Sequence, residues 1–252
     1  DEANAISAGL NVLSQIPTNN DSDQTDKLRS ITYAHASNVI STTTAQRLTY
    51  ESVLNKIAGG YKLAITDATA SSVASLSSDA HVASMAVVDT ASQISAHLSD
   101  LNAAGSKITS ISTGSDSGSF ALNYTDWMQS LPVFSKFNTA VSATINQVPA
   151  DKAVALASDV RIHAIHVSDS TAHINTNLDS LQQAINLIGS ISPSETSPAA
   201  MNLTSAQYIS DAPVLAKVTD GNYTLHVTNA TLDQLDALNA DAKVTQIQVR
   251  EG

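Results

Sequence analysis

The segment MAVVDTASQISAHLSDL, residues 85–101, returns 80 residues later as IHVSDSTAHINTNLDSL, residues 165–181. Apolar side chains keep their positions in both segments, and the match continues into a short strand-like stretch. Self-similarity at a fixed spacing is the sequence signature of repeat architectures. The recurring positions are Ile94 with Ile174, Leu98 with Leu178, Leu101 with Leu181, Ile108 with Ile188, and Ile111 with Ile191.

An earlier copy of the same unit precedes these two. It carries Ile6, Leu10 and Leu13, and its next apolar pair follows a longer loop. Three copies, 1–88, 89–168 and 169–252, therefore fill the chain as a single solenoid. Two later segments of each copy align as well. The first reads SVLNKI (52–57), PVFSKF (132–137) and PVLAKV (213–218) in the three copies. The second has four matching positions at the end of each copy: Leu76, Asp79, Met85 and Val87 in the first, Leu156, Asp159, Ile165 and Val167 in the second, and Leu238, Asp241, Ile247 and Val249 in the third.

Helix-like and strand-like segments alternate within a copy. The apolar spacing of residues 89–103 predicts one amphipathic helix, with Asp89, and Asp169 in the next copy, at the N-cap. A second helix is expected near 124–137 and 204–218, where a proline should kink it or mark its start. A third, shorter helix near 150–158 leads into a strand with alternating apolar residues.

Each copy thus predicts three helix-plus-strand turns. Sequential strands that are joined by a crossover helix pair in parallel, and such crossovers are right-handed. Nine turns predict a right-handed α/β solenoid with one elongated parallel sheet and helices along one side. A compact doubly wound α/β domain is the alternative, but no glycine-rich strand-to-helix turn interrupts the repetition.

The composition restricts the classes of partner. The chain has 252 residues, no cysteine and a formal net charge of −11, so disulfides and thiolate metal sites are excluded. A negative field of this size repels nucleic acid and anionic headgroups. No stretch reaches the length of apolar sequence that a membrane span needs, and we expect no nucleic-acid partner and no membrane span.

The loop NNDSDQTD, residues 19–26, holds the one candidate metal site. Asp21, Asp23 and Asp26 lie close enough in sequence to bind Ca²⁺ through carboxylate oxygens. The glycine and the distant glutamate of an EF-hand loop are missing, and the later copies have TGSDSGS and SPSETS in this place. A solvated, variable loop is therefore the competing interpretation.

Histidines gather around the start of the third copy. His163, His166 and His173 lie near Asp169, but the other copies have no histidine at these positions. Residues three apart on a strand point to opposite faces, so His163 and His166 do not readily share an ion. We predict surface or packing roles for them.

The sequence gives no sign of catalysis. It contains no nucleophile elbow, P-loop, dinucleotide fingerprint or HExxH motif, and we predict that the chain is not an enzyme. Carboxylate pairs of the glycosidase type depend on distances in space and stay open. Trp127 and Tyr124 are interpreted as packing residues of a helix. Five glycosylation sequons begin at Asn20, Asn123, Asn202, Asn222 and Asn229.

The two quoted segments resemble the V-x-D-T-A-x-x-I-x-x-x-L-x-x-L repeats of large secreted bacterial proteins. Such proteins are often exported by type I systems, and some are adhesins or components of S-layer-like coats. The resemblance covers all three copies, and its motif is a packing signature without catalytic residues. It implies a bacterial protein at the cell surface. The glycine-rich calcium repeats that often accompany such proteins are absent from this sequence.

These observations favour a structural segment of an extracellular bacterial surface protein that forms a filament, an S-layer or an adhesin stalk by self-association or within a longer repeat array. Asp1 shares the phase of Asp89 and Asp169, and Glu251 occupies the next such position, so we expect complementary end surfaces. The alternative is a carbohydrate-binding or carbohydrate-processing solenoid that uses the sheet face or the loops near Asp21 and Asp116, with cell-surface polysaccharide as a partner. A binding scaffold for a protein partner is the third hypothesis.

Overall fold

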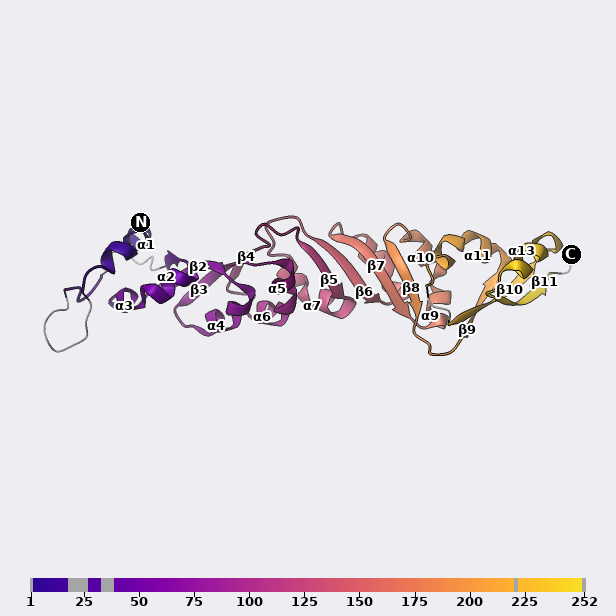
Figure 1. Ribbon diagram of the computed structural model, residues 1–252, viewed down its shortest axis with the longest axis horizontal. Coiled ribbons are helices and arrows are strands. Elements are labelled where there is room, and N and C mark those ends of the chain that lie inside the picture. Colours follow the sequence, from indigo (N-terminus) through magenta and orange to yellow (C-terminus); the bar gives the residue numbers. More distant parts are fainter. Residues whose placement is uncertain (1, 18–26, 33–38, 220–221, 251–252) are drawn as a thin grey trace. The chain divides into compact units, whose positions relative to one another are not determined.

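The computed structural model describes residues 2–17, 27–32, 39–219 and 222–250 (Figure 1). The chain divides into two compact units. The first comprises Asp1–Gly118 and Gln129–Ala140, and the second comprises Ser119–Met128 and Val141–Gly252. Both units are built from strands that alternate with short helices, so the expected α/β class is confirmed.

The first unit contains one four-stranded parallel sheet in the order β1-β2-β3-β4. Because each strand runs in the same direction as its neighbour, a helical segment must return the chain between them. The strands are β1 (Val39–Thr42), β2 (Lys62–Ala68), β3 (Val82–Val88) and β4 (Ile108–Ser112). The helices are α1 (Glu2–Leu13), α2 (Thr44–Thr49), α3 (Glu51–Leu54), η1 (Ala70–Ser72), α4 (Val73–Ser78), α5 (Ala91–Ala96) and α6 (Leu98–Ala103).

The second unit contains two parallel sheets, in the orders β5-β6-β7-β8 and β11-β10-β9. Their strands are β5 (Ser119–Asn123), β6 (Ser142–Val148), β7 (Ile162–Asp169), β8 (Ile188–Pro193), β9 (Ala199–Thr204), β10 (Tyr223–Ala230) and β11 (Val244–Val249). The helices are η2 (Ala150–Lys152), α8 (Ala153–Ala157), α9 (Thr171–Thr176), α10 (Leu178–Gln183), α11 (Ser205–Ser210), α12 (Ala212–Leu215), η3 (Leu232–Gln234) and α13 (Leu235–Ala240), while α7 (Tyr124–Phe134) contributes residues to both units.

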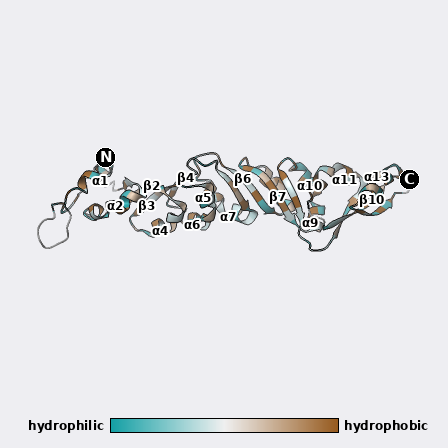
Figure 2. Ribbon diagram, viewed as in Figure 1, coloured by the Kyte–Doolittle hydropathy of each residue, from teal (hydrophilic) through white to brown (hydrophobic). Residues whose placement is uncertain are grey.

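Alternating burial along the strands explains why the sheets form. In β7, Ile162, Ile165 and Val167 are at most 5% exposed, and the residues between them are more open. Figure 2 shows the same alternation of hydrophobic and hydrophilic residues along β6 and β7. Each buried β-branched side chain stabilises the fold by roughly 1.5–3 kcal/mol relative to its exposed state.

The single elongated sheet of the prediction is replaced by three separate sheets, because each copy contains a strand that the prediction left out. These strands are β1, β5 and β9, and each opens a new sheet. The edge strands β4 and β8 each form only an isolated β-bridge with a later segment of the chain, Ile111 with Phe137 and Ile191 with Val218. Ile111 donates to the carbonyl of Lys136 and Ile191 to that of Lys217, at 2.9 and 2.8 Å, and the ladder does not continue.

The helix expected over residues 89–103 is two short helices, and its N-cap lies one residue later than predicted. The Thr90 side chain caps α5 and the Ser170 side chain caps α9. The break between α5 and α6 falls at His97, whose φ of −116° and ψ of 21° leave the helical region. The assignment of Asp89 and Asp169 as caps of their own helices is therefore wrong.

The two prolines behave differently. Pro213 stands in the first turn of α12, where its missing N–H and fixed φ are tolerated, so it marks a helix start as expected. Pro132 lies inside α7 near its end. The third predicted helix, near 150–158, is confirmed as η2 followed by α8.

Position 189 needs a glycine because the imidazole of His166 fills the space that a Cβ would occupy. A Cβ at this position would stand 2.7 Å from Cε1 of His166, whose ring Nδ1 also meets the Ser190 hydroxyl at 2.7 Å. We expect Gly189→Ala to lower the stability by about 1 kcal/mol, because the imidazole must shift. Urea unfolding measures this cost. Gly189→Ala combined with His166→Ala should recover most of the loss, and a double variant no more stable than Gly189→Ala would contradict the steric explanation.

Candidate functional site

Asp89 and Asp169 bind two backbone N–H groups each and join consecutive turns. Oδ1 of Asp169 accepts from Ser170 N at 2.8 Å, and Oδ2 accepts from Ala150 N at 2.9 Å. Asp89 makes the same pair of bonds, to Thr90 N and Ala70 N, at 2.8 and 2.9 Å. Each aspartate therefore accepts a hydrogen bond from the first N–H group of the helical segment in the preceding turn. The N–H groups at the start of a helix have no partner within the helix and need such an acceptor.

The same device recurs at other turns with a different acidic residue. In each case a carboxylate accepts the N–H of the first residue of an earlier helix, at 2.6 to 2.8 Å. The further pairs are Asp67 with Thr44, Asp116 with Ala91, and Glu195 with Thr171. Since Asp116 also accepts from Ser117 N at 2.6 Å, these backbone bonds hold the pKa of its carboxyl below the ordinary value. The carboxylate of Asp116 is thus occupied by the N–H group at the start of α5 and by that of Ser117.

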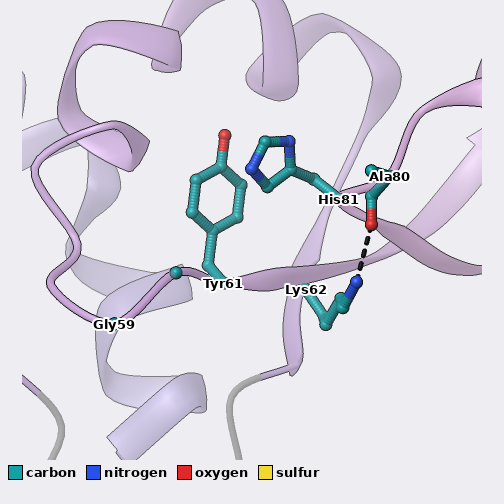
Figure 3. Close-up of a pocket in the computed structure, with 6 residues that line it drawn as sticks. Gly59, Tyr61, Lys62, Ala80 and His81 are labelled. Atoms are coloured by element: carbon teal, nitrogen blue, oxygen red, sulfur yellow. Dashed lines mark hydrogen bonds between the residues drawn. The ribbon is translucent and has the colours of Figure 1, made fainter.

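A second recurring cluster centres on Asp79, directly after α4. Its Oδ1 accepts from His81 N at 2.8 Å, and its Oδ2 forms an ion pair with the guanidinium of Arg47 on α2. The rings of Tyr61 and His81 stack with their centroids 4.3 Å apart, and Lys62 Nζ donates to the carbonyl of Ala80 at 2.7 Å (Figure 3). Burial raises the pKa of Asp79, but the hydrogen bonds from His81 and Arg47 outweigh it, and the net pKa is lowered.

The next copy builds its cluster on Asp159. Both carboxylate oxygens accept from Arg161, whose Nε and terminal nitrogen lie 2.9 and 2.6 Å away. The guanidinium carbon of Arg161 lies 4.9 Å from the ring centroid of the buried Trp127. A hydrogen-bonded guanidinium over an indole face is a cation–π arrangement. The prediction that Trp127 is a packing residue is confirmed.

The third copy builds its cluster on Asp241. The Tyr208 hydroxyl donates to Oδ2 of Asp241 at 2.9 Å, and Lys243 N donates to Oδ1 at 2.8 Å. The ammonium of Lys243 lies 4.4 Å from the ring centroid of Tyr223. Burial raises the pKa of Tyr223, and the nearby negative charge of Asp241 adds to the shift. All three clusters therefore combine an aspartate, a basic residue two positions later and an aromatic ring.

Two of these clusters border open pockets. The first, of about 310 Å³, is lined by Tyr61, Lys62 and His81 together with the Gly59–Gly60 turn. Both glycines have φ near +80°, the left-handed region that favours glycine. The second, of about 460 Å³, is lined by residues of the Asp241 cluster and by α11 and α12. In both clusters the aspartate already binds a backbone N–H and a strong side-chain donor, so it is poorly placed as a general base.

The predicted calcium ligands Asp21, Asp23 and Asp26 lie outside the described residues. Within the described ranges, no group of three or more histidine, aspartate or glutamate side chains is arranged to hold a metal ion. His166 and His173 have separate partners, Ser190 and Asp169, at 2.7 and 2.6 Å. None of the described helices has the length and hydropathy needed to cross a membrane.

Asp211 differs from the other acids because burial dominates it. Asp211 is 2% exposed, and its Oδ2 has no hydrogen-bond partner among the residues that the structure describes. Burial raises the pKa of Asp211, the charge of Asp179 adds to this, and a hydrogen bond from Ser210 opposes it. We expect Asp211→Asn to raise the free energy of unfolding at pH 7 by about 1 kcal/mol.

The sign of the pH dependence follows from the raised pKa. The folded state holds the Asp211 proton more tightly than the unfolded state, so the stability due to protonated Asp211 is lost as the pH rises through the folded pKa. The gain from Asp211→Asn should therefore appear in urea unfolding at pH 7 and vanish near pH 3. Asp179→Asn, the control, removes only the neighbouring charge and should give a smaller gain. Equal stabilities of Asp211→Asn and the unmodified protein at pH 7 would contradict the assignment.

Except for Trp127, which was predicted as a packing residue, the basic and aromatic members of the clusters were not predicted from the sequence. A usable signal existed, because each registered aspartate is followed two residues later by a basic residue, in Asp79–His81, Asp159–Arg161 and Asp241–Lys243. The helix partners gave no such signal, since Arg47, Trp127 and Tyr208 share no side-chain type. Their common role is visible only in the folded chain.

Comparisons of the chain with models of protein families, with curated proteins and with solved structures found no match. The resemblance to secreted bacterial repeat proteins therefore stays a prediction.

Proposed function

We propose that this chain is a structural segment of an extracellular bacterial surface protein, and that its turns continue as a right-handed α/β solenoid in a filament, surface layer or adhesin stalk. One observation carries the proposal. The acidic side chains that recur from copy to copy are used to join one turn to the next. Recurring polar groups with this role stabilise the packing of the turns. Their carboxylate oxygens already accept backbone hydrogen bonds, so they are poorly placed to act on a substrate.

The composition, which includes no cysteine, supports a structural role at an exposed surface. Charged residues make up 14% of the chain, so its polar surface depends largely on serine, threonine, asparagine and glutamine. The net charge of −11 makes identical copies repel one another, so ordered association needs specific contacts that outweigh this repulsion.

Electron microscopy of the purified chain over a range of concentrations tests this proposal. We expect filaments or sheets at high concentration, and light scattering should follow their formation. Isolated particles of constant size at every concentration would contradict an assembly role.

A carbohydrate-binding function is the second candidate, because the two pockets share lining residues at equivalent positions of two copies, Tyr61 with Tyr223 and His81 with Lys243. Each presents an aromatic ring, a basic group and a nearby carboxylate, which suit sugar hydroxyls and ring faces. One face of each ring is covered, by His81 and by Lys243. A glycan array discriminates: binding that is lost in both Tyr61→Ala and Tyr223→Ala would favour this candidate, and turnover of a polysaccharide would contradict the structural role.

A further inference from the structure

The last described turn, η3–α13–β11, leaves open an apolar surface that is covered in the equivalent earlier turns. Val249 is 40% exposed, whereas its counterparts Val87 and Val167 are each 1% exposed. Ile247 is half-buried, and its counterparts Met85 and Ile165 are fully buried. The residues are similar in kind, so the difference lies in what covers them.

The helical part of this turn shows the same difference. Leu232 is 78% exposed, while Ala70 and Ala150, which begin the equivalent segments η1 and η2, are completely buried. Leu235 is half-buried where Val73 and Ala153 are fully buried. We call Leu232, Leu235, Val244, Ile247 and Val249 the C-face. It joins one side of α13 to the edge strand β11.

In the earlier turns, the covering element is the helix pair and strand that come next in the chain. Within the first unit, α6 packs on α4 and β4 pairs with β3. Within the second unit, α10 packs on α8 and β8 pairs with β7. The natural occupant of the C-face is therefore a segment with the sequence pattern of α5–α6 and α9–α10.

The chain contains a third segment with this pattern, which is α1. Its Ile6 and Leu13 correspond to Ile94 and Leu101, and both counterparts are 0% exposed. In α1 these two side chains are only half-buried. We call Ile6 and Leu13 the N-face. α1 thus has partly open apolar residues at two positions whose counterparts in α5 and α6 are fully buried.

We propose that the C-face of one molecule receives the N-face of a second copy, head to tail. The contact would continue the packing already present between turns inside each unit, and it deepens the proposed function on which it rests. Such an interface uses two different surfaces, so each added molecule presents a new C-face to which a further copy binds. Leu232 is larger than the alanines it replaces, so the incoming helix has to sit farther out at that point.

The test uses two variants of the 252-residue chain. The C-face variant carries Ile247→Asp and Val249→Asp, and the N-face variant carries Ile6→Asp. Desolvating a carboxylate in an apolar contact should raise the dissociation constant by at least about tenfold, so each variant alone should sediment as a monomer of 26.2 kDa. Mixed together, they retain one intact face each and should form a 1:1 dimer that grows no further.

Matched controls separate the interface from a general effect of charge. Val160→Asp alters a valine that is 100% exposed between α8 and β7, and Val12→Asp alters a residue of α1 that is 69% exposed. Both should assemble like the unmodified chain. Circular dichroism establishes whether each variant is folded. If the C-face variant does not fold, Val249→Asp alone takes its place, and if the N-face variant does not fold, Leu13→Asp takes its place.

The outcomes distinguish the inference from the proposed function. If the unmodified chain assembles and the face variants assemble equally well, the head-to-tail contact is wrong and the structural role stands. Assembly of the N-face variant alone would indicate a symmetric contact between two C-faces and would also overturn the inference. A chain that stays monomeric at all concentrations contradicts both.

Discussion

Trp127→Ala is expected to lower the free energy of unfolding by about 3–5 kcal/mol, the range for removing a large aromatic side chain from a packed core. Trp127 is 1% exposed and is among the largest fully buried side chains of the described chain. Its loss also removes the ring beneath the guanidinium of Arg161, which lies 4.9 Å from the ring centroid. The remaining cavity and the altered position of the cation both act against the folded state.

Met128→Ala is the matched control for this substitution. Met128 follows Trp127 on α7 but is 44% exposed, so its truncation should change the stability by less than about 0.5 kcal/mol. Trp127 is the single tryptophan of the chain, so unfolding of the variants is followed by circular dichroism in urea. A cost below about 1 kcal/mol for Trp127→Ala would show that the indole is not packed as described.

The parallel α/β arrangement was predictable because buried apolar residues hold their positions in every copy. Ile165 and Ile111, for example, occupy registered positions in the sequence and are completely buried in the sheets. Such periodicity reflects the core directly, since only one set of side chains on each strand can face it. The order of helices and strands follows from this pattern.

The additional strands were not predictable from the same pattern. Residues 119–123, SFALN, alternate over only five positions and run straight into α7, so they could not be distinguished from the approach to a helix. The strand forms because β6 offers it a complete parallel partner. Tertiary pairing decides such short segments, and it also decides where one sheet ends and the next begins.

The position of the helix cap illustrates a different limit. In the Asp-Thr and Asp-Ser pairs at 89–90 and 169–170, both residues are good N-caps by type. The structure gives the cap to Thr90 and Ser170 because the aspartate is already bound to the turn before it. The clusters at Asp79, Asp159 and Asp241 depend similarly on contacts that no local pattern contains.

Asp169→Ala is expected to lower the free energy of unfolding at pH 7 by about 1–3 kcal/mol, because it leaves a buried N–H group without an acceptor. Ala150, whose N–H donates to Oδ2 of Asp169 at 2.9 Å, is 0% exposed, so water cannot readily replace the carboxylate. The same substitution removes the bonds to Ser170 N and to the His173 ring, at 2.8 and 2.6 Å.

The effect of Asp169→Ala should depend on pH in a definite direction. Burial raises the pKa of Asp169, but the bonds from Ala150, Ser170 and His173 outweigh it and lower the net pKa. The unfolded state therefore binds the proton more readily, and the stabilisation is present above the unfolded pKa of about 4 and lost as the pH falls through the folded value. In urea unfolding, Asp169→Ala should therefore lower the free energy of unfolding strongly at pH 7 and only slightly at pH 2–3.

Asp151→Ala provides the comparison that assigns this cost to the bond between turns. Asp151 lies in η2 beside Ala150, but its described side-chain contact is an ion pair with Lys152 at 2.7 Å on the surface. Its removal should change the stability by less than about 1 kcal/mol. Because Asp89 makes the same two backbone bonds as Asp169, Asp89→Ala should reproduce the larger cost and its disappearance at low pH. If both aspartates behaved like Asp151, the recurring carboxylates would not hold the turns together, and the main support for a structural role would be lost.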